Sequence, residues 1–118
     1  MGTIARALTC SRPPRRRSSP LVVAETAYLI DRQLGASAEA GFFRSIAAGD
    51  VLVEALTATD YARIADLVER YGDLPLGGSD ASLVALAERL GAVKVATLDQ
   101  RHFRVVRPRH VEALTLVP

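Results

Sequence analysis

The chain has almost no cysteine and no long apolar run, and each absence excludes a class of protein. Its single cysteine, Cys10, cannot form a disulfide within the chain, which excludes a disulfide-stapled scaffold and suits a reducing cytoplasm. No apolar run approaches the roughly 18–20 residues that cross a bilayer. Prolines and arginines interrupt the N-terminal stretch where a signal peptide needs an apolar core. We therefore expect a cytoplasmic protein without membrane contact or export signal.

Acidic residues are missing from the start of the chain. Residues 1–19 contain five arginines and no Asp or Glu, whereas residues 20–118 contain ten basic and thirteen acidic residues. The net charge of +2 therefore hides a basic segment followed by an acidic one. Such a proline-containing basic segment is typical of a disordered leader, and it can also bind nucleic acid nonspecifically. We predict a leader at 1–19 and, given 118 residues, one domain at 20–118.

Helical patterns alternate with short apolar runs after residue 19. Ser19-Pro20 predicts a helix start and Gly35 its end, and further helices are expected after Ser37 and after Thr57. Short strands are expected at 51–53, 93–97 and 114–116. This alternation predicts an α/β fold, a short parallel sheet covered by helices on both faces in three layers.

Two of these helices have predicted inner faces. The helix after Ser37 is expected to turn Ala38, Phe42, Ile46 and Ala47 inward, and Phe42 and Phe43 are interpreted as core or as a contact between subunits of a homodimer. The helix after Thr57 is expected to bury Tyr61, Ile64, Ala65, Val68 and Tyr71. Asp60 fits the stabilised first turn of that helix and is otherwise expected to face solvent.

The most informative stretch runs from Pro75 to Phe103. Ser79 is a candidate N-cap, and apolar residues at helical spacing follow until Gly91, a candidate left-handed end: Leu83, Val84, Ala87 and Leu90. Asp80 lies in the first turn of this helix, and Asp99 follows the next strand. Because ligands bind beyond the carboxyl ends of parallel strands, Asp80 and Asp99 are expected to meet at one site. Each also has a structural interpretation, Asp80 as a capping residue and Asp99 as a turn former.

Glu25 lies within LVVAETAYLI, a segment that is apolar on nearly every side. A buried carboxylate is costly unless it is paired or holds a metal. Glu25 is therefore either a metal ligand or part of a thin exposed strip with Arg32, seven residues later. Together, Glu25, Asp80 and Asp99 would form an oxygen-only cluster that favours Mg²⁺ or Mn²⁺ and suits phosphodiester hydrolysis. Thr97 is expected to orient a carboxylate or a water.

Arginines follow Asp99 closely. Arg101, Arg104, Arg107 and Arg109 supply four of the ten basic residues of segment 20–118. Arginines beside a carboxylate site fit a polyanionic substrate such as RNA, held by phosphate contacts. The alternative is ordinary surface charge, which is also the interpretation preferred for His102 and His110.

Three segments resemble PIN-domain proteins, and more narrowly the VapC-type toxin ribonucleases of toxin–antitoxin pairs. They are VVAETAYLIDRQLG, LPLGGSDASLVALAERLG and VATLDQRHFRVVRP, and the resemblance covers residues 20–118. It implies RNA cleavage by four acids around one or two Mg²⁺ or Mn²⁺ ions, and a VapB-type antitoxin as partner. Glu25, Asp80 and Asp99 match three of those acids.

The fourth acid, on the family's opening strand, has no counterpart, because no Asp or Glu precedes Glu25. We expect that strand and the family's first helix to be absent, leaving exposed strand edges in the sheet. We interpret this as a reading frame or start that departs from a working toxin gene; the alternative is a degenerate member of the family. Activity is then expected to be weak or absent. The alternatives are an inactive module that binds an antitoxin or a sister toxin, and a nucleic-acid-binding protein that works through its arginine arm.

Overall fold

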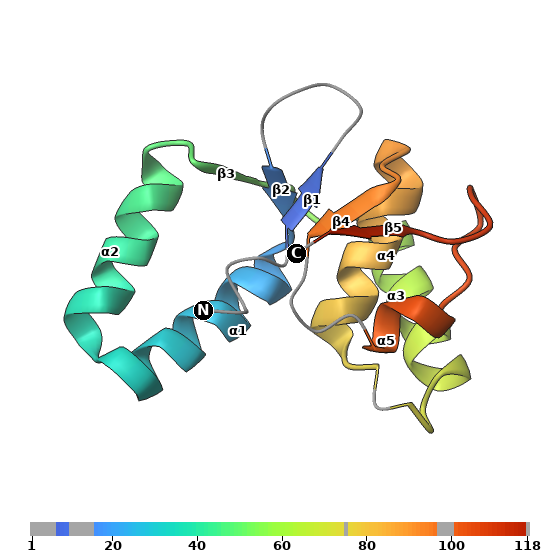
Figure 1. Cartoon of the computed structure of the whole chain (residues 1–118), viewed down its shortest axis with the longest axis horizontal. Helices are drawn as coiled ribbons and strands as arrows, with labels where there is room; N and C mark the ends of the chain where they lie inside the picture. Colours follow the sequence, from blue (N-terminus) through green and yellow to red (C-terminus); the bar gives the residue numbers. More distant parts are fainter. Residues whose placement is uncertain (1–6, 10–15, 75, 97–100, 118) are drawn as a thin grey trace.

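A five-stranded sheet forms the middle of the molecule, in the order β3-β2-β1-β4-β5 (Figure 1). The computed structural model describes residues 7–9, 16–74, 76–96 and 101–117. Parallel pairing joins β2 to β3 and β4 to β5, whereas β1 is antiparallel to both β2 and β4. Four of these strands therefore run in one direction and β1 runs against them. Each strand has three residues: β1 (Ala7–Thr9), β2 (Arg16–Ser18), β3 (Val51–Val53), β4 (Lys94–Ala96) and β5 (Thr115–Val117).

The N-terminal segment supplies the second and third strands of this sheet. Leu8 in β1 lies opposite Arg17 in β2 on one side and opposite Val95 in β4 on the other. At 7–9 and 16–18 the structure thus differs from the predicted leader, because pairing with neighbouring backbone, rather than any local pattern, makes these residues strands. β1 and β2 therefore cover the strand edges that were expected to be exposed. The domain boundary at residue 20 stays a prediction.

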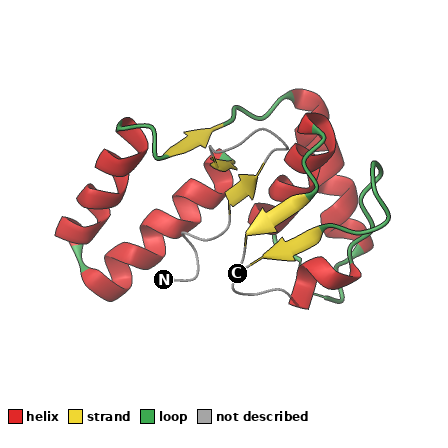
Figure 2. Cartoon of the chain, turned by 45° about the horizontal axis from the view of Figure 1, so that its top comes forward, coloured by secondary structure: helices red, strands yellow, loops and turns green. Residues whose placement is uncertain are grey.

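Two helices form a pair on the β3 side of the sheet (Figures 1 and 2). The predicted helix at 20–34 is confirmed as α1 (Pro20–Leu34), with Ser19 Oγ accepting from Val22 N–H at 3.2 Å. Gly35, with φ of 88°, ends it in a conformation that favours glycine. The prediction of a start at Ser37 is wrong, because α2 (Ala36–Ala47) begins directly after Gly35. No residue of α2 is buried, so its predicted inner face is only partly covered.

The core lies around α4 (Gly78–Leu90), which packs against α1, α3 (Ala58–Arg70) and β1. All residues from Asp80 to Ala87 are buried, as expected for a helix surrounded on every side. Gly91 adopts the predicted left-handed conformation, with φ of 69°. The helix starts at Gly78 after Gly77, so the prediction of Ser79 as N-cap is wrong. Phe103 of the short helix α5 (Arg101–Val105) also enters the core.

The predicted start of α3 is confirmed, and its predicted inner face is correct for Ile64 and Tyr71 but wrong for Tyr61, Ala65 and Val68. Thr57 and Asp60 form a capping box, with bonds of 2.9 and 3.1 Å. The buried residues are Asp60, Ile64 and Leu67, whereas Tyr61 and Val68 are exposed. The buried face is therefore turned away from Tyr61 and Val68, toward a carboxylate that was expected to face solvent. Within the described residues, no helix has the length and apolar content to cross a membrane.

Candidate functional site

Asp80 lies where α4 begins, and its side chain is almost fully buried at 6% exposure. It occupies the third helical position after Gly77. Backbone N–H groups at a helix start create a positive end, which stabilises a nearby carboxylate. The local sequence therefore suits a negative charge at this position.

Hydroxyl groups fix the start of α1 to the start of α4. Ser19 Oγ contacts Ser82 Oγ, and both residues are fully buried. Because Ser82 donates its proton to Ser79 O at 2.6 Å, the hydrogen bond between the two hydroxyls must be donated by Ser19. Ser79 Oγ in turn donates to Leu21 O at 3.4 Å. These contacts hold the first turns of the two helices side by side.

Glu25 lies on the helix that this contact brings to Asp80. It follows Leu21 by four residues, so the two share one face of α1, and Leu21 contacts Ser79, the neighbour of Asp80. Glu25 is half-buried. Arg32, which the alternative interpretation places with Glu25, is exposed and donates to Tyr28 Oη at 3.2 Å. Two of the predicted acids thus lie within the first two turns of neighbouring helices.

The remaining predicted site residues lie partly outside the described part of the chain. Thr97 and Asp99 are outside it altogether, and so is the side chain of Arg101. Within the described residues, no group of three His, Cys, Asp or Glu side chains is arranged to hold a metal. Glu25 and Asp80 nevertheless supply hard oxygen ligands, which are the kind that Mg²⁺ and Mn²⁺ prefer.

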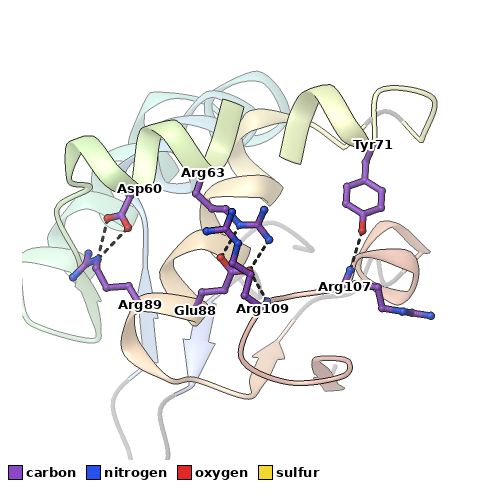
Figure 3. Close-up of polar contacts among 7 residues, drawn as sticks. All are labelled: Asp60, Arg63, Tyr71, Glu88, Arg89, Arg107 and Arg109. Atoms are coloured by element: carbon purple, nitrogen blue, oxygen red, sulfur yellow. Dashed lines mark hydrogen bonds and ion pairs between the residues drawn. The ribbon is translucent and has the colours of Figure 1, made fainter. Parts of the chain in front are cut away.

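The C-terminal arginines spread along α3 and α4 (Figure 3). Arg104 is exposed on α5. Arg107 N–H donates to Tyr71 Oη at 3.1 Å, just beyond the end of α3. Arg109 N–H donates to Glu88 Oε2 at 2.9 Å, and Glu88 follows Asp80 by about 12 Å along the helix axis. The prediction that Arg109 borders the carboxylate site is therefore wrong.

Two ion pairs that no local sequence pattern indicates join α3 to α4 (Figure 3). Arg89 Nε contacts the buried Asp60 carboxylate at 3.0 Å, which corrects the expectation that Asp60 faces solvent. Arg63 forms a two-bond contact with Glu88, at 2.8 and 2.9 Å. The partners lie 29 and 25 residues apart, so no helical spacing relates them.

These contacts change the titration of the Arg63–Glu88 pair. Burial raises the pKa of Glu88, but hydrogen bonds from Arg63 and from Arg109 N–H outweigh it, and the pKa lies below its usual value. The hydrogen bond to Glu88 raises the pKa of Arg63. Both groups therefore stay charged at neutral pH.

Comparison with known proteins supports the resemblance found in the sequence. The model of the PIN domain family matches residues 3–108. Ribonuclease VapC26 from Mycobacterium tuberculosis is 36% identical over 100 residues, which are 85% of this chain and 74% of that protein. The crystal structure of VapC20 from Mycobacterium tuberculosis, a toxin that cleaves the sarcin-ricin loop, superposes with a TM-score of 0.69. It covers 77% of this chain and 70% of VapC20, at 24% identity.

Proposed function

Because the chain belongs to the PIN-domain family of VapC-type ribonuclease toxins, we propose that it is a cytoplasmic, metal-dependent endoribonuclease with weak activity. Glu25, Asp80 and Asp99 are its proposed acids, with Mg²⁺ or Mn²⁺ as the cofactor. The observation that carries this proposal is the contact between the starts of α1 and α4, which brings the helices of Glu25 and Asp80 together.

The course of the chain is compatible with Asp99 joining this pair. Only three residues separate α4 from β4, so the chain turns back along the helix toward its beginning. Asp99 follows Ala96, the last residue of β4, by three positions, which span at most about 10 Å. The length of α4 is similar to that of β4 followed by three extended residues. The chain can therefore bring Asp99 back to the level of the start of α4.

The carboxylates determine the chemistry that the site supports. A divalent ion held by them supplies a more acidic water and neutralises charge on the scissile phosphate. Asp80 lies at the positive end of α4, which favours a negative charge at this position. Thr97 is proposed to orient a carboxylate, and Arg101, Arg104 and Arg107 are proposed to contact RNA phosphates.

Weak activity follows from the missing fourth acid. Residues 7–9 lie in the middle of the sheet but are Ala, Leu and Thr, and no carboxylate precedes Glu25. With three acids rather than four, the ion is held less tightly and its charge is less well balanced. RNA cleavage is then limited by metal occupancy, and higher concentrations of Mn²⁺ are expected to raise it.

The Asp80→Asn substitution tests the site through metal binding and cleavage. We expect Mn²⁺ to broaden NMR amide signals at the starts of α1 and α4 in the wild-type chain, and Asp80→Asn to weaken this binding by about tenfold or more. The residual RNA cleavage should fall to background in the same variant, because the ion loses a ligand.

The matched control is Asp66→Asn, which removes an exposed carboxylate from α3. It should leave both the Mn²⁺ effect and the cleavage unchanged. Equal Mn²⁺ broadening in wild type and Asp80→Asn would overturn the metal site. Cleavage that survives Asp80→Asn would place the catalytic centre elsewhere.

The second candidate function is a module that binds a VapB-type antitoxin or a second copy of the chain. The α1–α2 pair exposes large apolar side chains, with Tyr28 at 57%, Leu34 at 54% and Phe43 at 47%. Phe42 and Phe43 pack against each other with their ring centroids 5.7 Å apart. Exposed aromatic side chains of this kind are enriched at protein interfaces.

A further inference from the structure

A cleft of about 400 Å³ lies between α3, α4 and the segment that leads to β5. Its volume is within the range of small-molecule sites. The charged and titratable residues that line it are Asp60, Arg63, Glu88, Arg89, Arg109 and His110. Three arginines thus face two carboxylates, which leaves the cleft with a positive balance before His110 is counted.

Two of the arginines are held in fixed positions by the carboxylates. Glu88 fixes Arg63 through two hydrogen bonds. Arg89 is fixed by Asp60 and by a bond of 2.9 Å from Nη2 to Ala55 O. Because the carboxylates are occupied by these contacts, the guanidinium groups are oriented without losing all of their N–H donors.

Arg109 retains capacity for a ligand, and the ring of His110 lines the same cleft. Arg109 is anchored through its backbone N–H to Glu88, and its guanidinium makes no hydrogen bond or ion pair with another described residue. His110 Nε2 lies 2.6 Å from Ala92 O and must donate to this carbonyl. Its Nδ1 is buried without a hydrogen-bond partner among the described residues. Because this atom has almost no accessible surface, a ligand in the cleft does not reach it.

We propose that this cleft is a second anion site that binds a phosphate group through Arg109 and Arg63, beside the His110 ring. The phosphate is that of an RNA chain outside the cleaved bond, or that of a small phosphate ligand. Guanidinium groups bind phosphate with two hydrogen bonds at once. The RNA source depends on the proposed ribonuclease function, whereas the phosphate site itself does not.

The cleft is distinct from the proposed metal site. Glu88 follows Asp80 by eight residues, which is about 12 Å along α4. A phosphate bound beside Glu88 is therefore too far away to be the one attacked at Asp80. It would instead anchor the substrate and set its register.

The Arg109→Ala substitution tests the site in the full chain. Arg63 and Arg89 are unsuitable, because their loss would leave Glu88 or Asp60 buried without its partner. Arg109→Ala keeps the backbone hydrogen bond to Glu88, and Arg109→Lys keeps the charge but not the paired hydrogen bonds. Arg44→Ala, which removes an exposed arginine from α2, is the matched control.

Two ligands separate the two sources of phosphate. Inorganic phosphate is titrated while the NMR signals of the His110 ring are followed, and single-stranded RNA is titrated by fluorescence anisotropy in the presence of EDTA, which prevents cleavage. We expect Arg109→Ala to weaken the binding of inorganic phosphate and of RNA by about tenfold each. The salt dependence of RNA binding should fall by about one phosphate contact. Arg109→Lys should bind both ligands with affinities between those of wild type and Arg109→Ala.

The outcomes are distinct. If the binding of RNA and the binding of inorganic phosphate both weaken in Arg109→Ala, the cleft binds a phosphate of RNA. If only the binding of inorganic phosphate weakens, the cleft binds a small phosphate ligand. If neither does, or if Arg44→Ala has the same effect as Arg109→Ala, the site is overturned. Failure of the Asp80→Asn test with an intact Arg109 effect would remove the ribonuclease function and leave the phosphate site standing.

Discussion

Glu88 accepts hydrogen bonds from two separate parts of the chain. Arg63 reaches it from α3, and the backbone N–H of Arg109 reaches it from the segment before β5. The side chains of Arg63 and Glu88 are about nine-tenths buried. One carboxylate therefore joins two helices and a loop, and removing it leaves a buried guanidinium without its counter-charge.

Glu88→Gln is expected to destabilise the protein in a pH-dependent way. The folded-state pKa of Glu88 is lowered, so its stabilising contribution is present above the unfolded pKa of about 4.3 and is lost as the pH falls through the folded value. We expect a loss of about 1–3 kcal/mol at about pH 7, shrinking toward acid pH, measured by urea unfolding across that range.

The control is Glu69→Gln, because Glu69 is an exposed residue of α3, the helix that also carries Arg63. It should change the free energy of unfolding by less than about 0.5 kcal/mol. A Glu88→Gln loss of the same size at acid and neutral pH would contradict a role for the charge of Glu88.

At single residues, the sequence predicted local contacts but not contacts between distant segments. Asp60 was predicted to lie in the first turn of α3, where it forms a capping box with Thr57. Its second contact, with Arg89, was missed because a pair 29 residues apart leaves no local pattern. The same holds for the phosphate cleft, whose arginines come from α3, α4 and the segment after α5.

At the scale of elements, α2 and α4 are opposites. Eight consecutive residues of α4 are buried, whereas α2 buries none and contacts mainly α1. A helix with little tertiary packing depends on its own weak propensity. Local opening should therefore be much easier in α2 than in α4.

Amide hydrogen exchange is expected to reveal this difference. In the isolated chain, amides of α2 should exchange at least about tenfold faster than those of α4, as measured by mass spectrometry or NMR. Adding a VapB-type antitoxin should slow exchange in α2 and leave α4 unchanged, because α2 has apolar surface left to bury, whereas residues 80–87 of α4 are already buried.

Phe43→Ser provides the matched variant, since Phe43 is exposed and its loss should not disturb the core. The antitoxin effect should weaken in this variant. Equal protection of α2 and α4 in the isolated chain would mean that α2 is already covered, as in a homodimer, and sedimentation would then show a dimer.

At the scale of the molecule, the middle of the sheet depends on residues near the N-terminus. β1 and β2 connect the β3 edge to the β4–β5 pair, and they come from the most basic part of the sequence. Without them, the sheet would be split into β3 alone and the β4–β5 pair, with unpaired backbone groups at both breaks.

Deleting residues 1–18 is expected to abolish cooperative unfolding and to cause aggregation. The backbone groups of β3 and β4 would lose their partners, and exposed edges pair with other molecules. Thermal unfolding by circular dichroism and light scattering would measure both effects.

The control replaces Arg16 and Arg17 by Thr, which removes both charges and places a residue with high strand propensity at each position. It should remain folded. If the deletion instead leaves stability unchanged and reduces only nucleic-acid binding, then residues 1–18 are a leader of the kind predicted from composition.

The sequence alone determined the features that depend on neighbouring residues. Ser19-Pro20 and Gly35 marked the bounds of α1, Thr57 and Asp60 marked the start of α3, and Gly91 marked the end of α4, because caps and left-handed glycines act within one turn. Three acids in matching segments were enough to indicate the family.

Only the tertiary structure decided which distant segments meet. It placed a three-residue strand from the N-terminus between β2 and β4, and it turned α3 so that Asp60 and Arg63 face α4. Such choices depend on the summed burial and pairing of the whole chain, which no local pattern records.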